Sequence, residues 1–363
     1  MSKSLLQNPK RNGFSLIELL ISMAILSVII LLMSSMMDTT SKIWMGARDR
    51  TTQFRETRLS FEYFSRNLQQ ATLNTYWDYY YDSTRTNLPP QNMDETPSRH
   101  APNSELHFLT GQTDKLLGDT ERYRTHAVFF QAPLGYARNY TDMGNLLNAR
   151  GFFVEFGDDQ NTLPDFLKDR ITPRYRYRLK EFRPPGEDNM IYLDANASDK
   201  KKPVVLDQWY QPGSDLYRGR APYHELVRTV ADNVVALIIS PRWSEKEAKS
   251  RKLNPEDLAP EYRYDSNPSP PTDWTDPAKH QLPPLIKVVF VTISEKSARY
   301  LQDRHGSKPP PELEIEAGLF EQAGKLEKDL ARFEKHLQES KMEYRIFQSI
   351  LKLQGAKWTD VQR

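Results

Sequence analysis

GFSLIE, at residues 13–18, opens the stretch that decides the fold, and an apolar run continues from it to Met37. Glu18 is the only charged residue between Phe14 and Met37, and Asp38 ends the run. A bilayer core needs about 20 apolar residues, so this run is long enough to cross a membrane. The stretch therefore predicts a transmembrane helix over residues 14–37.

The residues before this run form a basic flank. Residues 1–13 contain Lys3, Lys10 and Arg11 and no acidic residue. Positive charge next to a span stays on the cytoplasmic side, so the amino end is expected in the cytoplasm and the remainder outside it. A secretory signal peptide has an apolar region of about 7–15 residues, which is shorter than this run.

Glu18 is the feature that a plain signal anchor does not explain. A plain anchor fits the length and the flanking charges and stays an alternative. A carboxylate inside a membrane costs about 2.5–3.5 kcal/mol on insertion scales, and such residues are usually functional. Glu18 is therefore a candidate functional residue.

The segment from Gly13 to Glu18, followed by an apolar helix, resembles the prepilin peptidase site of type IV pilins and pseudopilins. Members have a basic leader ending in Gly, cleavage before an apolar residue, and Glu at the fifth mature position. The resemblance implies a leader at residues 1–13, cleavage between Gly13 and Phe14, and N-methylation of Phe14. It also implies that Glu18 pairs with the amino terminus of a neighbouring subunit during assembly. The implied partners are the prepilin peptidase and other pilin or pseudopilin subunits, bound through the N-terminal helix.

The helix is predicted to continue past the membrane. No proline occurs between Pro9 and Pro89, so nothing in this stretch forces the helix to stop. Large apolar residues recur at helical spacing after Asp38, at Trp44, Phe54, Phe61, Phe64 and Leu68. The pattern predicts an amphipathic continuation over residues 38–72, with helix to about Gln70.

Residues 73–308 are predicted to form an exported domain. Short runs rich in aromatic and β-branched residues predict strands, with no alternation of strand and helix. The fold class expected is α+β, with a long N-terminal helix, an antiparallel β-sheet domain and a C-terminal helix. The predicted strands are 106–109, 127–131, 152–156, 175–182, 190–193, 234–239 and 285–293.

Three stretches outside these strands have other interpretations. Residues 82–103 and 244–283 are polar and proline-bearing, and both predict surface loops. The Tyr-rich segment 76–81 is interpreted as a helix-to-sheet transition packed on the domain. An aromatic platform for sugar or nucleic acid is the alternative.

Two stretches are similar to minor pseudopilins of the J type. They are Ala231–Ile239 and the Leu-Pro element with its apolar strand at Leu282–Phe290, and Tyr177–Leu179 with Phe182 adds a third similarity. The arrangement also resembles the pilin-like family called Verru_Chthon cassette protein C. Both resemblances imply a prepilin motif joined to an exported domain.

The carboxyl-terminal region, 309–363, is predicted to contain a helix and a closing strand. A helix over residues 313–338 has a narrow apolar seam, formed by Ala323, Leu326, Leu330, Phe333 and Leu337. This seam packs on its own domain or on a partner helix. Residues 344–353 are interpreted as a closing strand, with continuation of the helix as the alternative.

Composition and motifs give no support for catalysis or for a cofactor. The chain has no cysteine, and its seven histidines show no metal-ligand spacing. No nucleophile elbow or P-loop occurs. The net charge of +2 gives no global attraction to nucleic acid. The sequence therefore predicts a protein that is not an enzyme and that binds neither a metal nor a cofactor.

One basic cluster is a candidate phosphate-binding face. Arg174, Arg176, Arg178 and Lys180 would share one face of a strand, because side chains alternate along it. Such a face contacts DNA phosphates or is neutralised by nearby acids. The second interpretation is preferred, and nucleic acid is not an expected partner.

These predictions combine into one functional hypothesis. The chain is expected to be a cleaved and methylated minor pilin or pseudopilin of a type IV pilus or type II secretion-like system. It would be a single-pass protein of the bacterial inner membrane with a periplasmic domain. The alternatives are a pilin-anchored adhesin or DNA receptor and a plain membrane-anchored protein.

Overall fold

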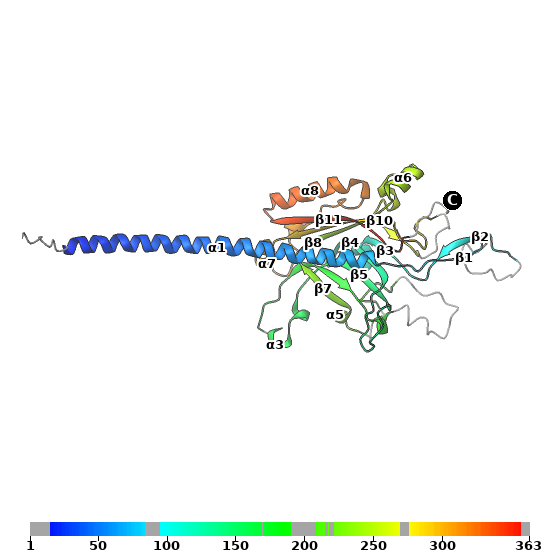
Figure 1. Cartoon of the computed structure of the whole chain (residues 1–363), viewed down its shortest axis with the longest axis horizontal. Helices are drawn as coiled ribbons and strands as arrows, with labels where there is room; N and C mark the ends of the chain where they lie inside the picture. The colour runs from blue at the N-terminus through cyan, green and yellow to red at the C-terminus, as the bar shows by residue number, and fades with distance from the viewer. Residues whose placement is uncertain are drawn as a thin grey trace, which may run out of the picture. The chain divides into compact units, whose positions relative to one another are not determined.

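The computed structural model describes residues 15–83, 95–168, 170–189, 208–214, 217, 221–268 and 276–356. The chain divides into two compact units, Met1–Thr52 and Gln53–Arg363. The first helix, α1 (Leu16–Gln69), begins in the first unit and ends in the second (Figure 1). Antiparallel sheets follow it, and helix α8 (Leu326–Glu339) lies near the carboxyl end. The predicted α+β class is therefore confirmed.

The part of α1 in the second unit carries the predicted apolar stripe. Phe64 and Leu68 are fully buried, and Phe61 packs against the same core. The ring of Phe64 lies 4.9 Å from that of Phe152 and 5.2 Å from that of Phe290. Trp44, in the first unit, is exposed, and the side chains of residues 46–54 lie outside the described ones.

The larger sheet has six strands in the order β7-β6-β5-β4-β3-β9, and all neighbours are antiparallel. Its central strands are buried on both faces, because alternate residues enter two different core clusters. Strands buried on both faces have nearly continuous apolar sequences. The strands are β3 (Leu109–Gln112), β4 (Tyr123–Pro133), β5 (Leu147–Gly157), β6 (Arg176–Phe182), β7 (Val227–Asp232) and β9 (Tyr264–Asp265).

The smaller sheet has three antiparallel strands in the order β11-β10-β8. They are β8 (Val234–Arg242), β10 (Leu285–Ile293) and β11 (Tyr344–Lys352). One face meets α1, where the ring of Phe61 lies 4.9 Å from that of Phe290. On the other face, Lys287 pairs with Glu327 of α8. The sheet is therefore covered by a helix on each side (Figure 1).

A bulge in β4 joins the two sheets. The register of β4 against β5 shifts between Arg124 and Val128, and Thr125 has a φ of 59°. Positive φ is rare for a β-branched residue. The Thr125 hydroxyl accepts the N–H of Leu237 at 3.1 Å, and Nδ1 of His126 accepts the N–H of Ile239 at 3.1 Å. Two side chains of the bulge thus take the place of a neighbouring strand at the edge of β8.

The predictions for the carboxyl-terminal region are largely confirmed. Residues 344–352 form the closing strand β11, so continuation of the helix is wrong. The predicted helix begins at Leu326 rather than at Leu313, because short 3₁₀ turns at Pro311–Leu313 and Ala323–Lys325 precede it. All five residues of the apolar seam are buried by this chain, which favours packing on its own domain.

Several predicted loops contain regular structure. Residues 76–80 form strand β1 (Tyr76–Tyr80), which pairs with β2 (Arg99–Asn103) inside the predicted loop 82–103. Helix α6 (Glu245–Arg251), a 3₁₀ turn at Pro255–Leu258 and β9 occupy the predicted loop 244–283. Both loop predictions are wrong in part, because polar composition does not exclude short elements.

Other boundaries differ by a few residues. The strand predicted at 106–109 begins at Leu109, because side chains bond the earlier backbone: Gln131 accepts the N–H of His107 and Ser266 that of Phe108. The strand predicted at 190–193 lies outside the described residues. The other α-helices in the part of the chain that the structure describes are α2 (Thr113–Leu117), α3 (Asp165–Lys168), α5 (Tyr223–Leu226) and α7 (Glu295–His305).

Candidate functional site

The first turn of α1 is held by a reciprocal cap between Ser15 and Glu18. The backbone N–H of Ser15 donates to Oε2 of Glu18 at 2.9 Å, and its hydroxyl donates to the same oxygen at 3.0 Å. The N–H of Glu18 donates back to the Ser15 hydroxyl at 3.3 Å. This is a capping box, in which each residue satisfies a backbone donor that the helix start would leave unpaired.

The cap leaves part of the Glu18 carboxylate available. Both bonds from Ser15 end on Oε2, and no described residue donates to Oε1. The carboxylate is exposed and sits where the partial positive charge of the helix start stabilises an anion. It can therefore keep its cap and accept a second donor, such as the ammonium group of another chain.

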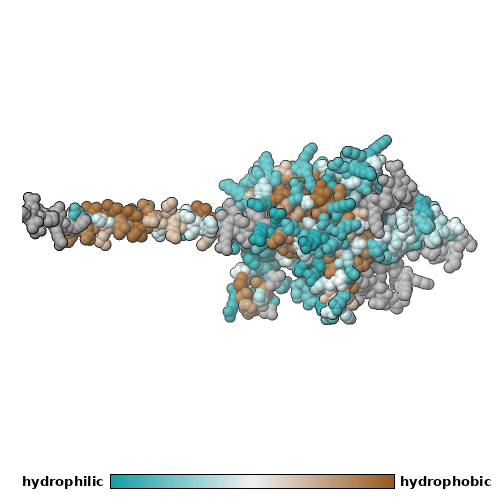
Figure 2. All heavy atoms as spheres, in the orientation of Figure 1, coloured by the Kyte–Doolittle hydropathy of each residue, from teal (hydrophilic) through white to brown (hydrophobic). Residues whose placement is uncertain are grey.

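The helix that follows is apolar and uncovered. Residues Leu16–Met45 are long and apolar enough to cross a membrane, and none of the apolar window is buried inside the protein. Figure 2 shows hydrophobic residues along most of this segment, interrupted by paler and hydrophilic ones toward its carboxyl end. Two serine hydroxyls within it donate to backbone carbonyls four residues earlier, Ser22 to Glu18 at 2.6 Å and Ser27 to Met23 at 2.5 Å. Internal bonding of this kind suits a helix without surrounding water.

The other residues of the predicted processing site lie outside the described ones. These are the basic leader residues Lys3, Lys10 and Arg11 and the two residues at the predicted cleaved bond, Gly13 and Phe14. The sequence interpretation missed Ser15 as a functional residue. Its signal was present, because a Ser three residues before a Glu at a helix start is the capping-box pattern.

The cations of the predicted basic face are paired with acids, and two of the four are buried. Arg176 and Arg178 are 4% and 2% exposed, whereas Arg174 is exposed. Arg174 Nε lies 2.8 Å from Asp159 Oδ2, and Arg178 Nε lies 2.7 Å from Asp232 Oδ1. Arg176 pairs with Glu295, and Lys180 Nζ lies 3.9 Å from Glu155 Oε2 and donates to the Thr229 hydroxyl at 2.9 Å.

These ion pairs lower the pKa of two acids on this face, Glu295 and Asp159. Burial alone would raise the pKa of Glu295, but hydrogen bonds from Arg176, Asn233 and Arg299 lower it to about 2. Hydrogen bonds from Arg174 likewise hold the pKa of Asp159 below its ordinary value, against the opposing effect of burial. The arrangement favours the neutralised face over the phosphate-binding one.

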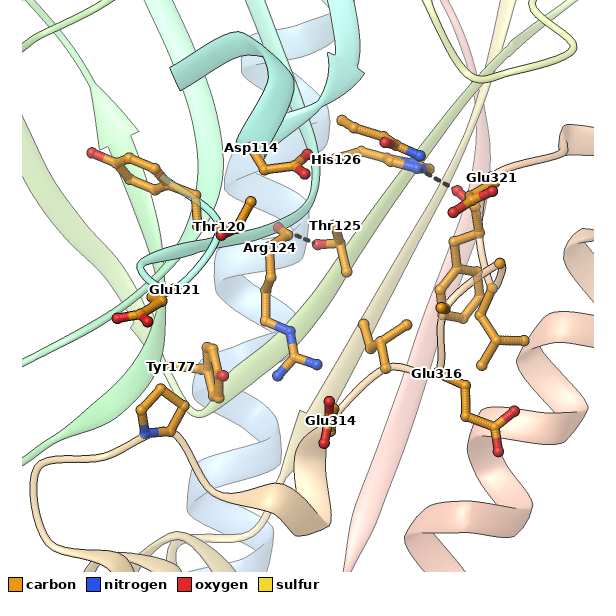
Figure 3. Close-up of a pocket in the computed structure, with 18 of the residues that line it drawn as sticks. Asp114, Thr120, Glu121, Arg124, Thr125, His126, Tyr177, Glu314, Glu316 and Glu321 are labelled. Carbon is orange, nitrogen blue, oxygen red and sulfur yellow. Dashed lines mark hydrogen bonds between the residues drawn. The ribbon is translucent and has the colours of Figure 1, made fainter. Parts of the chain in front are cut away.

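A cavity of about 520 Å³ lies between β4 and residues 309–321 (Figure 3). The guanidinium of Arg124 stacks 4.4 Å above the Tyr177 ring and donates to the carbonyl of Leu313. His126 accepts at Nδ1 from Ile239, so its other nitrogen carries the proton and donates to the carbonyl of Phe320 at 3.0 Å.

Burial lowers the pKa of His126 to about 4, so the ring is neutral near pH 7. Both of its nitrogens bond backbone groups, and neither is free to move a proton. Arg124 and His126 thus attach residues 313–320 to the sheet. Among the described residues, no group of three His, Cys, Asp or Glu side chains could hold a metal ion.

The Tyr-rich segment is not packed on the domain as predicted. It forms the β1–β2 ribbon, where Trp77 and Tyr79 are 59% and 52% exposed. Both rings lie on one side of the ribbon, because residues two apart on a strand share a face. Only Tyr80, on the other side, is buried.

Comparison with known proteins agrees with the geometry of the amino-terminal segment. Residues 8–34 match the family model described as the prokaryotic N-terminal methylation motif. No curated protein and no solved structure matches the chain. The matched residues include Glu18, its cap and the first part of the exposed apolar helix. The chain therefore carries the prepilin methylation motif of type IV pilin-like proteins, the family that this match supports.

Proposed function

We propose that the chain is a minor pilin or pseudopilin, cleaved between Gly13 and Phe14 and methylated at Phe14. It would assemble into a type IV pilus or a type II secretion-like system. The observation that carries this proposal is the uncovered apolar helix Leu16–Met45, whose first turn is held by the cap between Ser15 and Glu18. A helix that is apolar on every side is stable only within lipid or among other helices.

The proposed topology follows from the charges before this helix. Lys3, Lys10 and Arg11 would remain in the cytoplasm, and the span would cross the inner membrane. The unit Gln53–Arg363 would lie in the periplasm. A subunit with so large a unit packs poorly along a filament shaft, so we place it at the tip or in the initiating complex.

The finer relationship proposed is to minor pseudopilins of the J type and to Verru_Chthon cassette protein C. Two of the stretches similar to J-type proteins lie on adjacent strands. Ala231–Ile239 covers the end of β7 and most of β8, and Leu282–Phe290 leads into β10, the antiparallel neighbour of β8. The two similarities thus belong to one structural element.

Glu18 would act as the acidic partner of a neighbouring subunit's Phe14 ammonium group. In a membrane or filament core, each of these charges is costly alone, and a well-placed pair offsets part of that cost. Oε1 of Glu18 can accept the ammonium while Oε2 keeps the bonds to Ser15. Pairing would therefore fix the axial register between neighbouring helices.

The processing step is tested by mass spectrometry of the mature amino terminus from the native host. The expected first residue is a methylated Phe14. An intact Met1 would refute processing and leave only a membrane anchor.

The role of the Glu18 charge is tested with three matched variants. Gln can keep the capping bonds without the charge, so Glu18→Gln separates the two roles. If pairing drives assembly, Glu18→Gln and Glu18→Ala both insert and are cleaved but leave the filament at least about tenfold depleted in this subunit. Ser15→Ala removes the hydroxyl and keeps the charge, and it should assemble. Normal incorporation of Glu18→Gln, measured by immunoblotting sheared filaments, would show that only the cap matters.

A further inference from the structure

One face of the β1–β2 ribbon is aromatic and open to solvent. Four side chains share this face, because antiparallel pairing sets residues directly opposite one another: Trp77 with Pro102, and Tyr79 with His100. Trp77 and Tyr79 are more than half exposed, and His100 is exposed beside them. The His100 ring meets the Tyr79 ring edge to face, with the ring centres 4.9 Å apart. These four residues are called the aromatic platform below.

The opposite face of the ribbon holds it on the domain. Tyr80 is buried there, and the ammonium group of Lys279 lies 5.5 Å from the centre of its ring. Asn103 is buried as well, and its side-chain amide donates to the Asp78 carboxylate at 3.3 Å. The ribbon is therefore attached through one face and presents the aromatic platform on the other.

The aromatic platform combines apolar ring faces with polar ring edges. No described residue forms a hydrogen bond with the Trp77 indole N–H, the Tyr79 hydroxyl or the His100 ring nitrogens. Neither strand contributes a Lys, Arg, Asp or Glu side chain to this face. Arg99 lies on the other face, where it pairs with Asp82 at 3.1 Å. Such a surface suits an uncharged ligand that has both C–H and O–H groups.

We propose that the aromatic platform binds a neutral polysaccharide of β-1,4-linked, glucose-type sugars. Aromatic ring faces carry partial negative charge and attract C–H groups. In these sugars the hydroxyls project from the rim of the ring, so both flat faces present C–H groups and the rim can reach the polar ring edges. Trp77 and Tyr79 begin about 7 Å apart along the strand. Each can therefore contact a separate sugar unit of one extended chain.

Other ligands fit the aromatic platform less well. Sites for single-stranded nucleic acid add cations that neutralise phosphates, and the described part of this face has no Lys or Arg. A stable protein interface buries about 800 Å² on each partner, whereas the two half-exposed rings together expose less than about 300 Å². Lipid is remote from the chain's connection to the span, because α1 crosses the second unit from Gln53 to Gln69 before the ribbon begins (Figure 1).

The test uses the full chain, labelled with 5-fluorotryptophan, in a detergent that has no sugar headgroup. Cellohexaose is the probe, and maltohexaose, the same sugar in a curved α-linked chain, is its matched control. Cellohexaose should shift the fluorine resonance of Trp77, assigned from its absence in Trp77→Phe, in a saturable way, and maltohexaose should bind more weakly. No saturable shift up to about 5 mM cellohexaose would overturn the proposal. Equal affinity for maltohexaose would overturn the assignment to a flat, β-linked chain.

Tyr79→Ala removes one ring of the aromatic platform and should weaken cellohexaose binding at least about tenfold in calorimetry. Tyr300→Ala is the matched control, because Tyr300 of α7 is 52% exposed, as Tyr79 is, and it should leave the affinity unchanged. Thermal unfolding checks that both variants are folded. Trp77→Ala should abolish binding, whereas Trp77→Phe, which keeps an aromatic ring, should retain part of it. Equal affinity in Tyr79→Ala and the wild type would overturn the proposal.

Two further outcomes would replace the polysaccharide by another ligand. A thymidine dodecamer that binds the wild type more tightly than cellohexaose does, and not Tyr79→Ala, would assign the aromatic platform to nucleic acid. A Trp77 resonance that shifts with protein concentration, without any sugar, would assign it to contact between copies of the chain. Neither measurement depends on cleavage at Gly13 or on assembly, so the proposed function can fail without affecting this one.

Discussion

The two parts of α1 differ in what covers their apolar side chains. From Leu16 to Met45 they are exposed on every side of the helix, with Leu26 56% exposed. In the second unit they form one stripe, where Phe64 and Leu68 are fully buried. The same secondary structure thus serves two environments. The first part takes its stability from what lies outside the chain, and the second is part of the domain core.

Their polar groups differ in the same way. In the first part, hydroxyl groups bond carbonyls of their own helix, as Ser27 does to Met23. In the second part, the Ser60 hydroxyl also bonds a carbonyl of its own helix, that of Glu56 at 3.0 Å. The Tyr63 hydroxyl, however, reaches the sheet and donates to Oε1 of the fully buried Glu181 at 2.9 Å. This contrast predicts that substitutions in the two parts of one helix change different properties of the protein.

The largest expected effect is on the buried stripe. Phe64→Ala should lower the free energy of unfolding of the domain by about 3–5 kcal/mol, because it removes a fully buried ring and leaves a cavity. Urea denaturation of the full chain in detergent, followed by tryptophan fluorescence, measures this loss. Leu59→Ala, 56% exposed on the same helix, is the matched control and should change it by less than about 0.5 kcal/mol. Equal losses in both variants would contradict a one-sided stripe.

The next effect concerns insertion of the first part. Leu26→Arg should add about 2.5–3.5 kcal/mol to the free energy of membrane insertion, because it places a charge near the centre of the apolar run. The protein should move from the membrane to the soluble fraction in a cell-free translocation assay, while Leu26→Ala remains inserted. The urea midpoint of the domain should not change in either variant. A destabilised domain would show that the first part contributes to the folded core.

The sequence predicted best those elements whose residues are buried on both faces. Residues 234–239 and 285–293 are continuous apolar runs, and they lie in β8 and β10. Short elements were missed because their partners determine them. β9 has two residues, and it exists because Tyr264 and Asp265 pair with Thr110 and Leu109 of β3.

In the candidate site, too, the features set by local sequence were predictable and the contacts between distant residues were not. The processing motif and the span were visible in residues 13–37, because each depends on local order and spacing. The partners of the basic face were not, since Glu295 is 119 residues from Arg176 in the sequence. The cap on Glu18 depends on a three-residue spacing and was predictable, but the availability of Oε1 required the geometry.

A smaller effect is expected on how the stability of the domain depends on pH. Burial lowers the pKa of His126 to about 4, and burial with the nearby charge of Lys279 does the same for His280. The unfolded chain binds these protons near pH 6.5, so domain stability should fall as the pH is lowered from 6.5 to 4. The first part of α1 contains no histidine, so these two groups do not lie in it.

His126→Gln should be less stable at pH 7 and should show a shallower pH dependence over the same window. Urea midpoints at half-unit pH steps measure both properties. The exposed His100→Gln controls for the loss of a histidine as such. A slope in His126→Gln equal to that of the wild type would show that this ring is not the titrating group.

The smallest effect should come from the surface charges of the second part. Arg58 Nε lies 3.1 Å from Glu62 Oε1, with both side chains more than half exposed. Solvent and salt weaken such a pair, so Arg58→Gln should cost only about 0.2–0.5 kcal/mol of unfolding free energy. A double-mutant cycle with Glu62→Gln, measured at low and high salt, isolates the pair. A coupling above about 1 kcal/mol would mean that charge also holds this part of α1 in place. A coupling near zero, together with a large loss of unfolding free energy in Phe64→Ala, would show that the buried stripe holds this part of α1 on the domain.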